Sequence, residues 1–467
     1  MVGISSIGIS IPRFRLDRAL IGKAWGKKQP PGDKAVASYD EDAVTLAIAA
    51  ANECLQEVDP FSCDGLFFAS TSSPYREKQV ASLVATACDL PREILTADFG
   101  GSIRAGIAAL SAAVRAVQSG AARRVVVTVA DCRPAAPESD LEGVLGDGAV
   151  AVVVDGQASR AEFVGAAAVA EEFTFLWRRD ASDSVQSQDA RFAVTHGFLR
   201  DLGEVIGRVM NEHGIGTEEL AALAVGSPDA RSAQELATSL ALDPKRQLVP
   251  SLAASVGVLG SPDPLLLLAA ALEKAKPGAP IVAAAFGEGA EAVLLRAGAR
   301  AGQGACRPSI GAAIERKLPL PTYEKYLKFR RILGQDDSPV EIVSNILEAR
   351  ELQQDVRLYG SRCQACGLVQ YPQARVCLGC KKREALEPVK LNKRGKIFTF
   401  TVDYLAANLD HPMGMAVVDL EGGGRVYVQT TDCIPDDVKV GAPVELTFRR
   451  LHEGGDNYNY YWKARPQ

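Results

Sequence analysis

Short apolar runs alternate with longer amphipathic stretches along the first two thirds of the chain. Residues 3–10, 66–69, 124–130 and 149–154 are apolar runs of strand length, whereas residues 103–118 repeat apolar positions with the period of a helix. Strands that are apolar throughout occur in sheets covered on both faces. The pattern therefore predicts an α/β domain whose sheet lies between layers of helices.

A second amphipathic stretch, residues 40–56, opens with the acidic side chains of Asp40, Glu41 and Asp42. Negative charge is stabilising at the amino end of a helix because the helix dipole is positive there. We therefore predict a helix that follows these three acids, whose charges its dipole favours.

Two segments of this domain share one order of elements. In the first, a helix and the strand VVVTVA are followed by Gly146-Asp-Gly-Ala149 and the strand VAVVV. In the second, the helix LLLLAAALEKA and the strand IVAAAF are followed by Gly287-Glu-Gly-Ala290 and the strand AVLLR. Any two βα units share a helix, a glycine and a strand, but the Gly-acid-Gly-Ala turn in both copies favours an internal duplication.

Beyond residue 390 the hydrophobic period changes to two. Short alternating segments begin at Gly395, Met415, Arg425 and Val444 and are separated by Gly and Asp, which is typical of a small antiparallel barrel. The predicted domains are a first α/β half (1–165), a second α/β half (166–333), a linker with a helix (334–357), a cysteine-rich ribbon (358–388) and a small barrel (389–467).

Four cysteines in the ribbon have the spacing of a metal site. Cys363-x-x-Cys366 is followed, after ten residues, by Cys377-x-x-Cys380. Two such pairs can place four thiolates at the corners of a tetrahedron, which zinc accepts at sulfur distances near 2.3 Å. Two incidental or redox CxxC motifs are the alternative. A closed set of four sulfurs leaves no coordination position open, so we predict a structural zinc ion.

Composition narrows the possible partners. The net charge is −5 and the pI about 5.7, a field that does not attract nucleic acid or anionic membranes. The basic run at 381–383 would suit nucleic acid, but a solvated turn explains it equally. We read no signal peptide, and the longest apolar run, residues 265–272, is too short to span a bilayer. Six cysteines scattered in apolar contexts favour a cytoplasmic protein.

The first 330 residues resemble the thiolase superfamily, in particular the archaeal-type hydroxymethylglutaryl-CoA synthases. The segments that carry this resemblance are Ile11–Arg15, Ala24–Gly26, Asp40–Thr45, Ser73–Tyr75, Ala105–Gly106, Gly146–Ala149 and Tyr323–Arg330. Residues 358–465 resemble the zinc-ribbon and OB-fold module that accompanies thiolase-type enzymes, through the four cysteines, Tyr371-Pro372 and the segment 395–401.

The resemblance implies a thiolase-like duplicated fold of five layers, followed by a zinc ribbon and an OB-fold barrel. It also implies C–C bond chemistry on CoA thioesters, in a homodimer or in a heteromer with another thiolase-type subunit. In the family a Cys at a helix amino end takes the acyl group, and a Glu and a His move protons.

The residues at the family's catalytic positions differ in this chain. Thr71 stands where the Glu is expected, Ser102 or Ile103 replaces the Cys, and Gly226 or Ser227 replaces the His. An expected Asn is Val258.

Ser102 could be a nucleophile, which would need an adjacent base, or the N-cap of the following helix, which needs nothing more. We favour the cap. If no covalent acyl group forms, Asp98, Asp131 or Tyr75 could act as a base, and the spacing selects none of them.

Three functions follow from these observations. The chain is an acyl-CoA C–C lyase or transferase that uses no cysteine, or a catalytically silent subunit beside an active thiolase-type chain, or, least favoured, a nucleic-acid binder. Cations are needed for the phosphates of CoA, and Lys328, Arg330 and Arg331 are candidates within the family-like segment. Others are Lys27, Lys28, Arg178 and Arg179.

Overall fold

A computed structural model describes residues 1–180, 182, 184–302, 304–333, 344–405, 410, 412–454 and 457–467. The chain forms two compact units. The first comprises Met1–Ala37 and Asp42–Tyr323, and the second comprises Ser38–Glu41 and Glu324–Gln467. The boundaries predicted between the two α/β halves, at both ends of the linker and between the ribbon and the barrel stay predictions.

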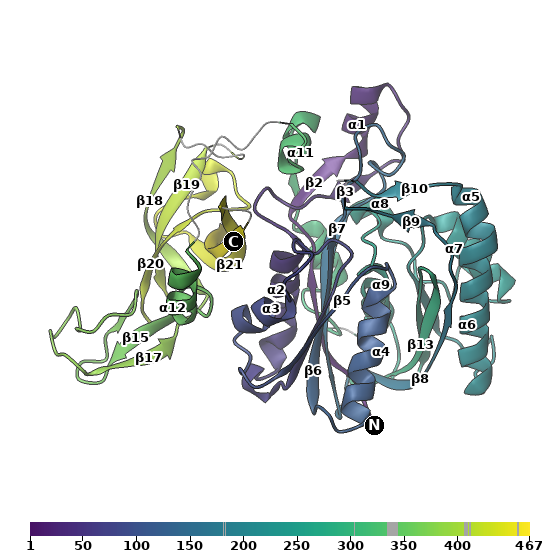
Figure 1. The fold of residues 1–467 in the computed structure, drawn as a ribbon, viewed down its shortest axis with the longest axis horizontal. Coiled ribbons are helices and arrows are strands. Elements are labelled where there is room, and N and C mark those ends of the chain that lie inside the picture. Colours follow the sequence, from purple (N-terminus) through teal and green to yellow (C-terminus); the bar gives the residue numbers. More distant parts are fainter. Residues whose placement is uncertain are drawn as a thin grey trace. The chain divides into compact units, whose positions relative to one another are not determined.

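A nine-stranded sheet runs through the first unit in the order β11-β12-β13-β8-β1-β7-β6-β4-β5 (Figure 1). Its strands are β1 (Gly3–Ser10), β4 (Gly65–Ala69), β5 (Leu95–Phe99), β6 (Arg124–Cys132), β7 (Asp147–Asp155), β8 (Ala161–Ala170), β11 (Ala222–Val225), β12 (Pro280–Phe286) and β13 (Gly289–Ala297). The central strands β6 and β7 are buried almost throughout, as their unbroken Val and Ala runs predict.

Helices pack on the outer faces of this sheet and between its two halves. The larger ones are α2 (Ala43–Cys54), α3 (Ala81–Ala87), α4 (Ala105–Gln118), α6 (Leu199–Glu212), α7 (Ala230–Ser239) and α9 (Asp263–Leu272). Helix α2 packs on β1, β7 and β6, while α6 packs on β13, β8 and β12. Helices α4 and α9 contact each other and pack on the two half-sheets, α4 on β4, β6 and β7 and α9 on β11 and β12. This arrangement is the predicted five-layer sandwich.

The internal duplication is confirmed by strand pairing. β6 pairs antiparallel with β7, and β12 pairs antiparallel with β13. β4 lies parallel to β6 as β11 lies parallel to β12. Even the parallel neighbour β5 of the first half has a counterpart, an isolated parallel bridge between Leu223 and Leu248.

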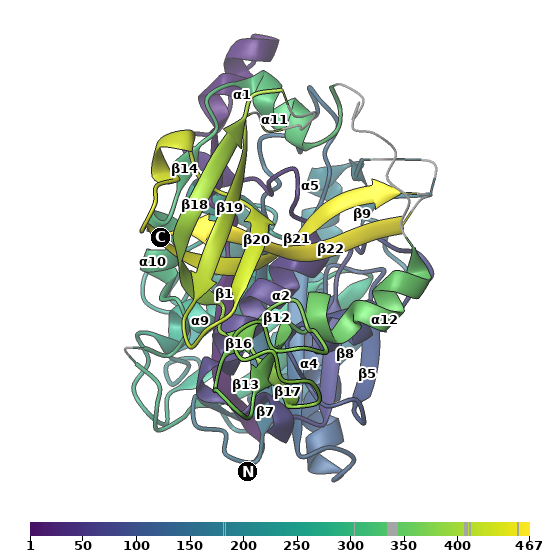
Figure 2. The same ribbon diagram turned by 90° about the vertical axis from the view of Figure 1, so that its left-hand side faces the viewer.

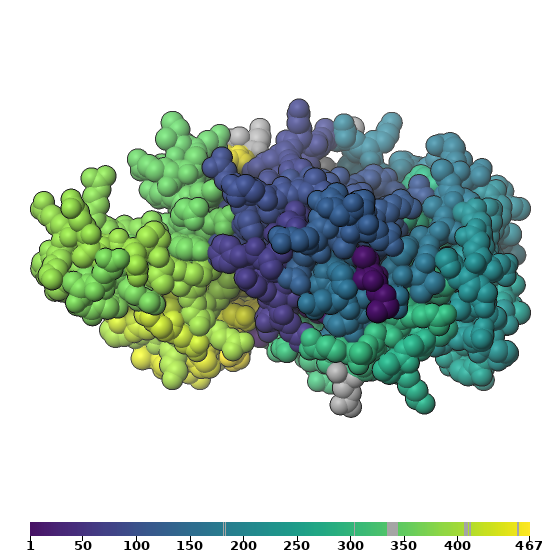
Figure 3. All heavy atoms as spheres, turned by 90° about the horizontal axis from the view of Figure 1, so that it is seen from below, coloured from purple at the N-terminus to yellow at the C-terminus, as the bar shows by residue number. Residues whose placement is uncertain are grey.

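Shorter elements complete the first unit. They are β2 (Phe14–Asp17), α1 (Arg18–Trp25), β3 (Asp33–Ala35), β9 (Leu176–Trp177), β10 (Gln186–Ser187), α5 (Ala190–Ala193), α8 (Ala253–Val256), α10 (Ile310–Glu315) and β14 (Leu318–Pro319). The amino terminus lies on the surface, where Met1 is 86% exposed (Figure 3).

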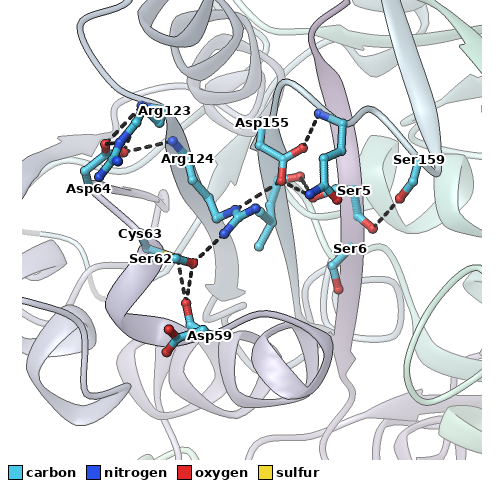
Figure 4. A network of polar contacts seen from close by, with 12 residues as sticks. Ser5, Ser6, Asp59, Ser62, Cys63, Asp64, Arg123, Arg124, Asp155 and Ser159 are labelled. Atoms are coloured by element: carbon cyan, nitrogen blue, oxygen red, sulfur yellow. Dashed lines mark hydrogen bonds and ion pairs between the residues drawn. The ribbon is translucent and has the colours of Figure 1, made fainter.

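A polar network fixes the register of β1, β7 and β6 at one end of the sheet (Figure 4). Arg124 at the start of β6 lies 3.0 Å from Asp155 at the end of β7, and the Ser5 hydroxyl of β1 donates to the same carboxylate at 2.9 Å. Because Asp155 is buried, these partners satisfy a charge that would otherwise be costly.

The predicted helix after the three acids is present, but the acids differ in their roles. Helix α2 begins at Ala43, and only Asp42 caps it, in a capping box with Thr45. Asp40 and Glu41 belong instead to the second unit, where they meet buried cations. The expectation that all three acids serve the helix dipole was wrong.

The second unit contains a ribbon and a barrel. The ribbon consists of β15 (Tyr359–Cys363), β16 (Val369–Gln370) and β17 (Leu386–Lys390). Figure 2 shows β18 (Arg394–Asp403), β19 (Met413–Leu420) and β20 (Arg425–Gln429) side by side, crossed by β21 (Pro443–Gly454) and β22 (Asn457–Pro466). The alternation did not predict β22. Helices α11 (Tyr323–Phe329) and α12 (Asn345–Asp355) precede the ribbon, and residues 334–343 of the predicted linker lie outside the described residues.

A buried ionic network lies inside the second unit. Arg449 of β21 pairs with Glu41 and Asp432, and Lys463 of β22 lies 2.9 Å from Asp40. All of these side chains are at most 9% exposed. Removing one partner of such a network leaves an uncompensated buried charge.

Replacing Arg449 by Ala should therefore lower the free energy of unfolding by about 3–5 kcal/mol. The control is Arg425→Ala, because Arg425 pairs with Asp419 at about half exposure and should change stability by about 1 kcal/mol or less. Denaturant unfolding of the full chain measures both. Equal effects for the two variants would contradict the importance of burial.

The contact of β1 with α2 depends on Gly8. A Cβ there would lie 2.1 Å from the Ala50 carbonyl oxygen and 2.4 Å from the Cys54 amide nitrogen. Gly8→Ala should therefore destabilise the first unit by about 1–3 kcal/mol or more. Gly203→Ala is the control, because Gly203 lies within α6 with no atom within 4 Å of a new Cβ, and it should be neutral or stabilising by up to about 1 kcal/mol. A thermal melt in which Gly8→Ala is neutral would contradict this packing.

Candidate active site

The residues predicted to occupy the family's catalytic positions gather around one concave site in the first unit. Two neighbouring hollows share Ile103, Arg133, Phe175 and Leu176. The Thr71 hollow is further lined by Thr71, Gly101, Ser102, Trp177, Arg178, Val185, Gly287 and Glu288. The Phe286 hollow is further lined by Leu141, Val144, Leu145, Phe198, Gly226, Ser227, Pro228, Val258, Gly260, Asp263, Pro264, Ala285 and Phe286. Thus Thr71, Ser102, Ile103, Gly226, Ser227 and Val258, far apart in sequence, are brought together.

The topology explains this convergence. Thr71, Arg133, Gly226 and Gly287 each follow the carboxyl end of a strand, namely β4, β6, β11 and β12. Ligands of open α/β sheets bind beyond these strand ends. Helices α4 and α9 begin at the same place, so their positive dipole ends also face the site.

Two glycines permit close approach between the two halves. A Cβ at Gly106, in the first turn of α4, would lie 2.6 Å from the Ser261 carbonyl oxygen just ahead of α9. A Cβ at Gly287 would lie 2.6 Å from the Ser102 hydroxyl oxygen. The site is therefore built at the seam of the duplication.

Ser102 is not the N-cap that we favoured. Helix α4 begins at Ala105, and Arg104 precedes it without a side-chain cap. The Ser102 hydroxyl donates to the Gly287 carbonyl at 3.3 Å and accepts from the Arg104 amide at 3.4 Å. These contacts connect the two halves. Among the described residues, no basic side chain forms a hydrogen bond with the Ser102 hydroxyl, so nothing there would activate it as a nucleophile.

Asp131 and Asp98, two candidate bases, are held in structural hydrogen bonds. One Asp131 oxygen accepts from the hydroxyl groups of Ser70, Thr71 and Ser72, and the other from the Ser261 amide. Asp98 accepts from the amides of residues 80 and 81 at the start of α3. Tyr75, the third candidate, has the Lys78 ammonium 4.6 Å from its ring centroid.

Arg133 stands out in the shared wall of both hollows. It is 3% exposed, and its Nη2 donates to the Val258 carbonyl at 3.3 Å. Its Nε and Nη1 have no hydrogen-bond partner in the described part of the chain. The guanidinium packs on Gly260, where a Cβ would lie 2.6 Å from Nε.

Asp263 lies next to this guanidinium at the first position of α9. Its carboxylate accepts from the Gly260 amide at 3.1 Å. Burial raises the pKa of Asp263 to about 6, while the amides of Gly260 and Leu259 and the charge of Arg133 oppose this shift. A half-ionised carboxyl near neutral pH can both take and return a proton.

Sequence reasoning missed Arg133 and Asp263. Arg133 comes two residues after Asp131, at the end of a strand that had been predicted correctly, and Asp263 lies two residues before the predicted helix LLLLAAALEKA. Their positions just after a strand and just before a helix were the available signal.

The predicted CoA-binding cations Lys328, Arg330 and Arg331 are not among the residues that line the two hollows. Lys328 is exposed on α11 in the second unit, Arg330 lies 5.7 Å from the Tyr326 ring centroid, and Arg331 pairs with Glu453 at 2.7 Å. Both hollows are lined by residues of the first unit. Of the cations named from the sequence, Arg178 lines the Thr71 hollow and donates to the Thr71 carbonyl at 3.3 Å. A role for Lys328, Arg330 or Arg331 in binding stays a prediction.

The four ribbon cysteines meet as a metal site requires. All four sulfur atoms lie within 4.8 Å of one another, with Cys363 3.7 Å from Cys380 and Cys366 3.6 Å from Cys377. Sulfurs held about 2.3 Å from a tetrahedral zinc ion are about 3.8 Å apart. Amides of Gly379 and Cys380 point at the Cys377 sulfur, which favours the thiolate.

These features define the first unit as a thiolase fold. A structure described as MvaS in complex with 3-hydroxy-3-methylglutaryl coenzyme A matches with a TM-score of 0.64 at 22% identity, covering 73% of this chain and 94% of the other. A 3-oxoacyl-[acyl-carrier-protein] synthase III from Aquifex aeolicus matches with a TM-score of 0.58 at 22% identity, covering 63% of this chain and all of the other.

Curated relatives identify the family. Hydroxymethylglutaryl-CoA synthase of Thermococcus onnurineus is 30% identical over 297 residues, which cover 62% of this chain and 84% of the relative. The enzyme of Pyrococcus horikoshii is 29% identical over 339 residues, covering 71% and 93%. The chain belongs to the hydroxymethylglutaryl-CoA synthase family.

The carboxyl-terminal part matches a different family. Residues 388–449 match the domain described as ChsH2, C-terminal OB-fold domain. The predicted barrel is thereby confirmed as an OB-fold. No helix in the described ranges combines the length and hydropathy that crossing a bilayer requires.

Proposed function

We propose that the chain forms or cleaves a C–C bond next to a CoA thioester by an aldol-type step, with no acyl-cysteine intermediate. Family membership supports the substrate class, because relatives are hydroxymethylglutaryl-CoA synthases and a structure similar to this fold is an HMG-CoA synthase complexed with CoA. The observation that carries the proposal is the lining of the site: the described residues around both hollows include neither Cys nor His.

An aldol step requires fewer catalytic groups than acyl transfer through a covalent intermediate. It requires a group that accepts a hydroxyl proton and a cation or set of donors that holds the thioester oxygen as an enolate. The site offers a carboxyl group, a guanidinium and two helix amino ends for these tasks. Its apolar wall, formed by Phe175, Leu176, Phe198 and Phe286, suits an alkyl portion of the substrate.

A catalytically silent subunit is the second hypothesis, and the unsatisfied donors of Arg133 argue against it. Two buried guanidinium nitrogens without hydrogen-bond partners among the described residues cost stability, which a scaffold has no reason to retain. The cytoplasmic location, and pairing as a homodimer or with another thiolase-type chain, remain predictions.

The purified chain alone should cleave short 3-hydroxyacyl-CoA thioesters to an acyl-CoA and a carbonyl compound. Liquid chromatography with mass spectrometry measures both products. The mass of the intact protein should stay unchanged after incubation with acetyl-CoA. An acyl adduct on the chain would contradict the non-covalent step. Turnover that appears only when a cysteine-bearing partner chain is added would establish the silent-subunit hypothesis instead.

For the ribbon, we propose one structural zinc ion bound by Cys363, Cys366, Cys377 and Cys380. Elemental analysis of the purified chain should find about one zinc per molecule, and Cys377→Ser should lose the metal and lower the melting temperature, because metal binding supplies folding energy to such small modules. Cys433→Ser, outside the cluster, is the matched control and should keep the zinc. A stable, folded chain without zinc would refute this assignment.

A further inference from the structure

Two nitrogens of the buried Arg133 guanidinium have no hydrogen-bond partner in the described part of the chain. Arg160 meets Glu57, Arg124 meets Asp155, and Arg449 meets Glu41 and Asp432. Arg133 has no carboxylate within ion-pair distance in the described part of the chain, and only a carbonyl accepts from it. A charge buried in this way is stable when an anionic group of a ligand completes its coordination.

Arg133 also faces the space where a ligand would sit. It lines both the Thr71 hollow and the Phe286 hollow, and Gly260 leaves room for the guanidinium because it carries no side chain. Gly260 joins it to Asp263, whose carboxylate accepts the Gly260 amide hydrogen and lines the same Phe286 hollow. One glycine thus brings a cation and a carboxyl group to one wall.

We propose that Arg133 and Asp263 are the catalytic pair of this site, with Arg133 holding the thioester oxygen of a 3-hydroxyacyl-CoA and Asp263 moving the proton of its 3-hydroxyl. This assignment rests on the proposed aldol-type function and names the residues that perform it. It gives the two charged side chains of the wall distinct tasks.

The step is balanced without any further reactant. In cleavage, the Asp263 carboxylate takes the proton from the 3-hydroxyl, the C3–O bond becomes a carbonyl, and the C2–C3 bond breaks. Its electron pair moves into the thioester as an enolate, whose oxygen is held by Arg133. The proton on Asp263 then passes to C2, which releases an acyl-CoA and an aldehyde or ketone. Reversal of the same steps forms the bond.

Charge and burial fit these tasks. The Arg133 cation is preorganised in a site shielded from water, where it stabilises negative charge on oxygen more strongly than in solvent. Asp263 has a pKa near 6 because burial disfavours its charged form, so the carboxylate that accepts the proton forms as pH rises through 6. We therefore expect kcat to rise with pH up to about 7.

The test uses Arg133→Met and Asp263→Asn in the full chain. Each should reduce kcat about 100-fold or more, while binding of free CoA, measured by calorimetry, changes less than about fivefold. The rise of kcat through pH 6 should vanish in Asp263→Asn. Arg246→Met and Glu218→Gln, which break an exposed ion pair of the same unit, are the controls and should keep full activity.

Exchange of the C2 protons of acetyl-CoA in D2O, measured by NMR, distinguishes failure of the proposed function from failure of the assignment of Arg133 and Asp263. If the wild-type chain neither cleaves 3-hydroxyacyl-CoA nor exchanges these protons, the proposed function fails. If it does both and Arg133→Met or Asp263→Asn retains them, the function stands and this assignment of residues is overturned. Should Arg133→Met not fold, Arg133→Lys keeps the buried charge and is expected to fold and lose kcat at least tenfold.

Discussion

The packing of α4 against α9 between the two half-sheets is the contact on which the site depends. Gly106 lets the first turn of α4 approach the backbone at Ser261, so both helices begin at the same point. The strand ends that carry Thr71, Arg133 and Gly226 meet beside this contact, so residues from distant parts of the chain line one site. The duplication therefore creates a site that neither half contains by itself.

Within this frame the proposed chemistry differs from that of a cysteine enzyme. A cysteine nucleophile works at a helix amino end because the dipole stabilises its thiolate. The same two dipoles remain here, but the wall now offers a fixed cation and a carboxyl group close to neutrality. Such a pair favours reactions in which charge develops on a thioester oxygen, without a covalent bond to the protein.

Much of the architecture was predictable from the sequence, for identifiable physical reasons. The unbroken apolar runs of β6 and β7 and the repeated Gly-acid-Gly-Ala turns predicted buried strands and a duplication, and both are present. The cysteine spacing predicted a cluster because its geometry is local. The roles of Asp40, Glu41 and Ser102 were mispredicted, since acids and hydroxyls near a helix can serve tertiary contacts instead. The proximity of Arg133 and Asp263 could not be predicted from the sequence, because the two residues are 130 positions apart and meet only through the tertiary contact at Gly260.

The account is tested most directly by a crystal structure of the chain bound to a 3-hydroxyacyl-CoA analogue in which a methylene replaces the thioester sulfur. The account predicts that the acyl end occupies the Phe286 hollow, with its carbonyl oxygen within hydrogen-bond distance of Arg133 and its hydroxyl facing Asp263. An acyl end bound outside both hollows, with the Arg133 guanidinium paired to a protein carboxylate, would contradict it.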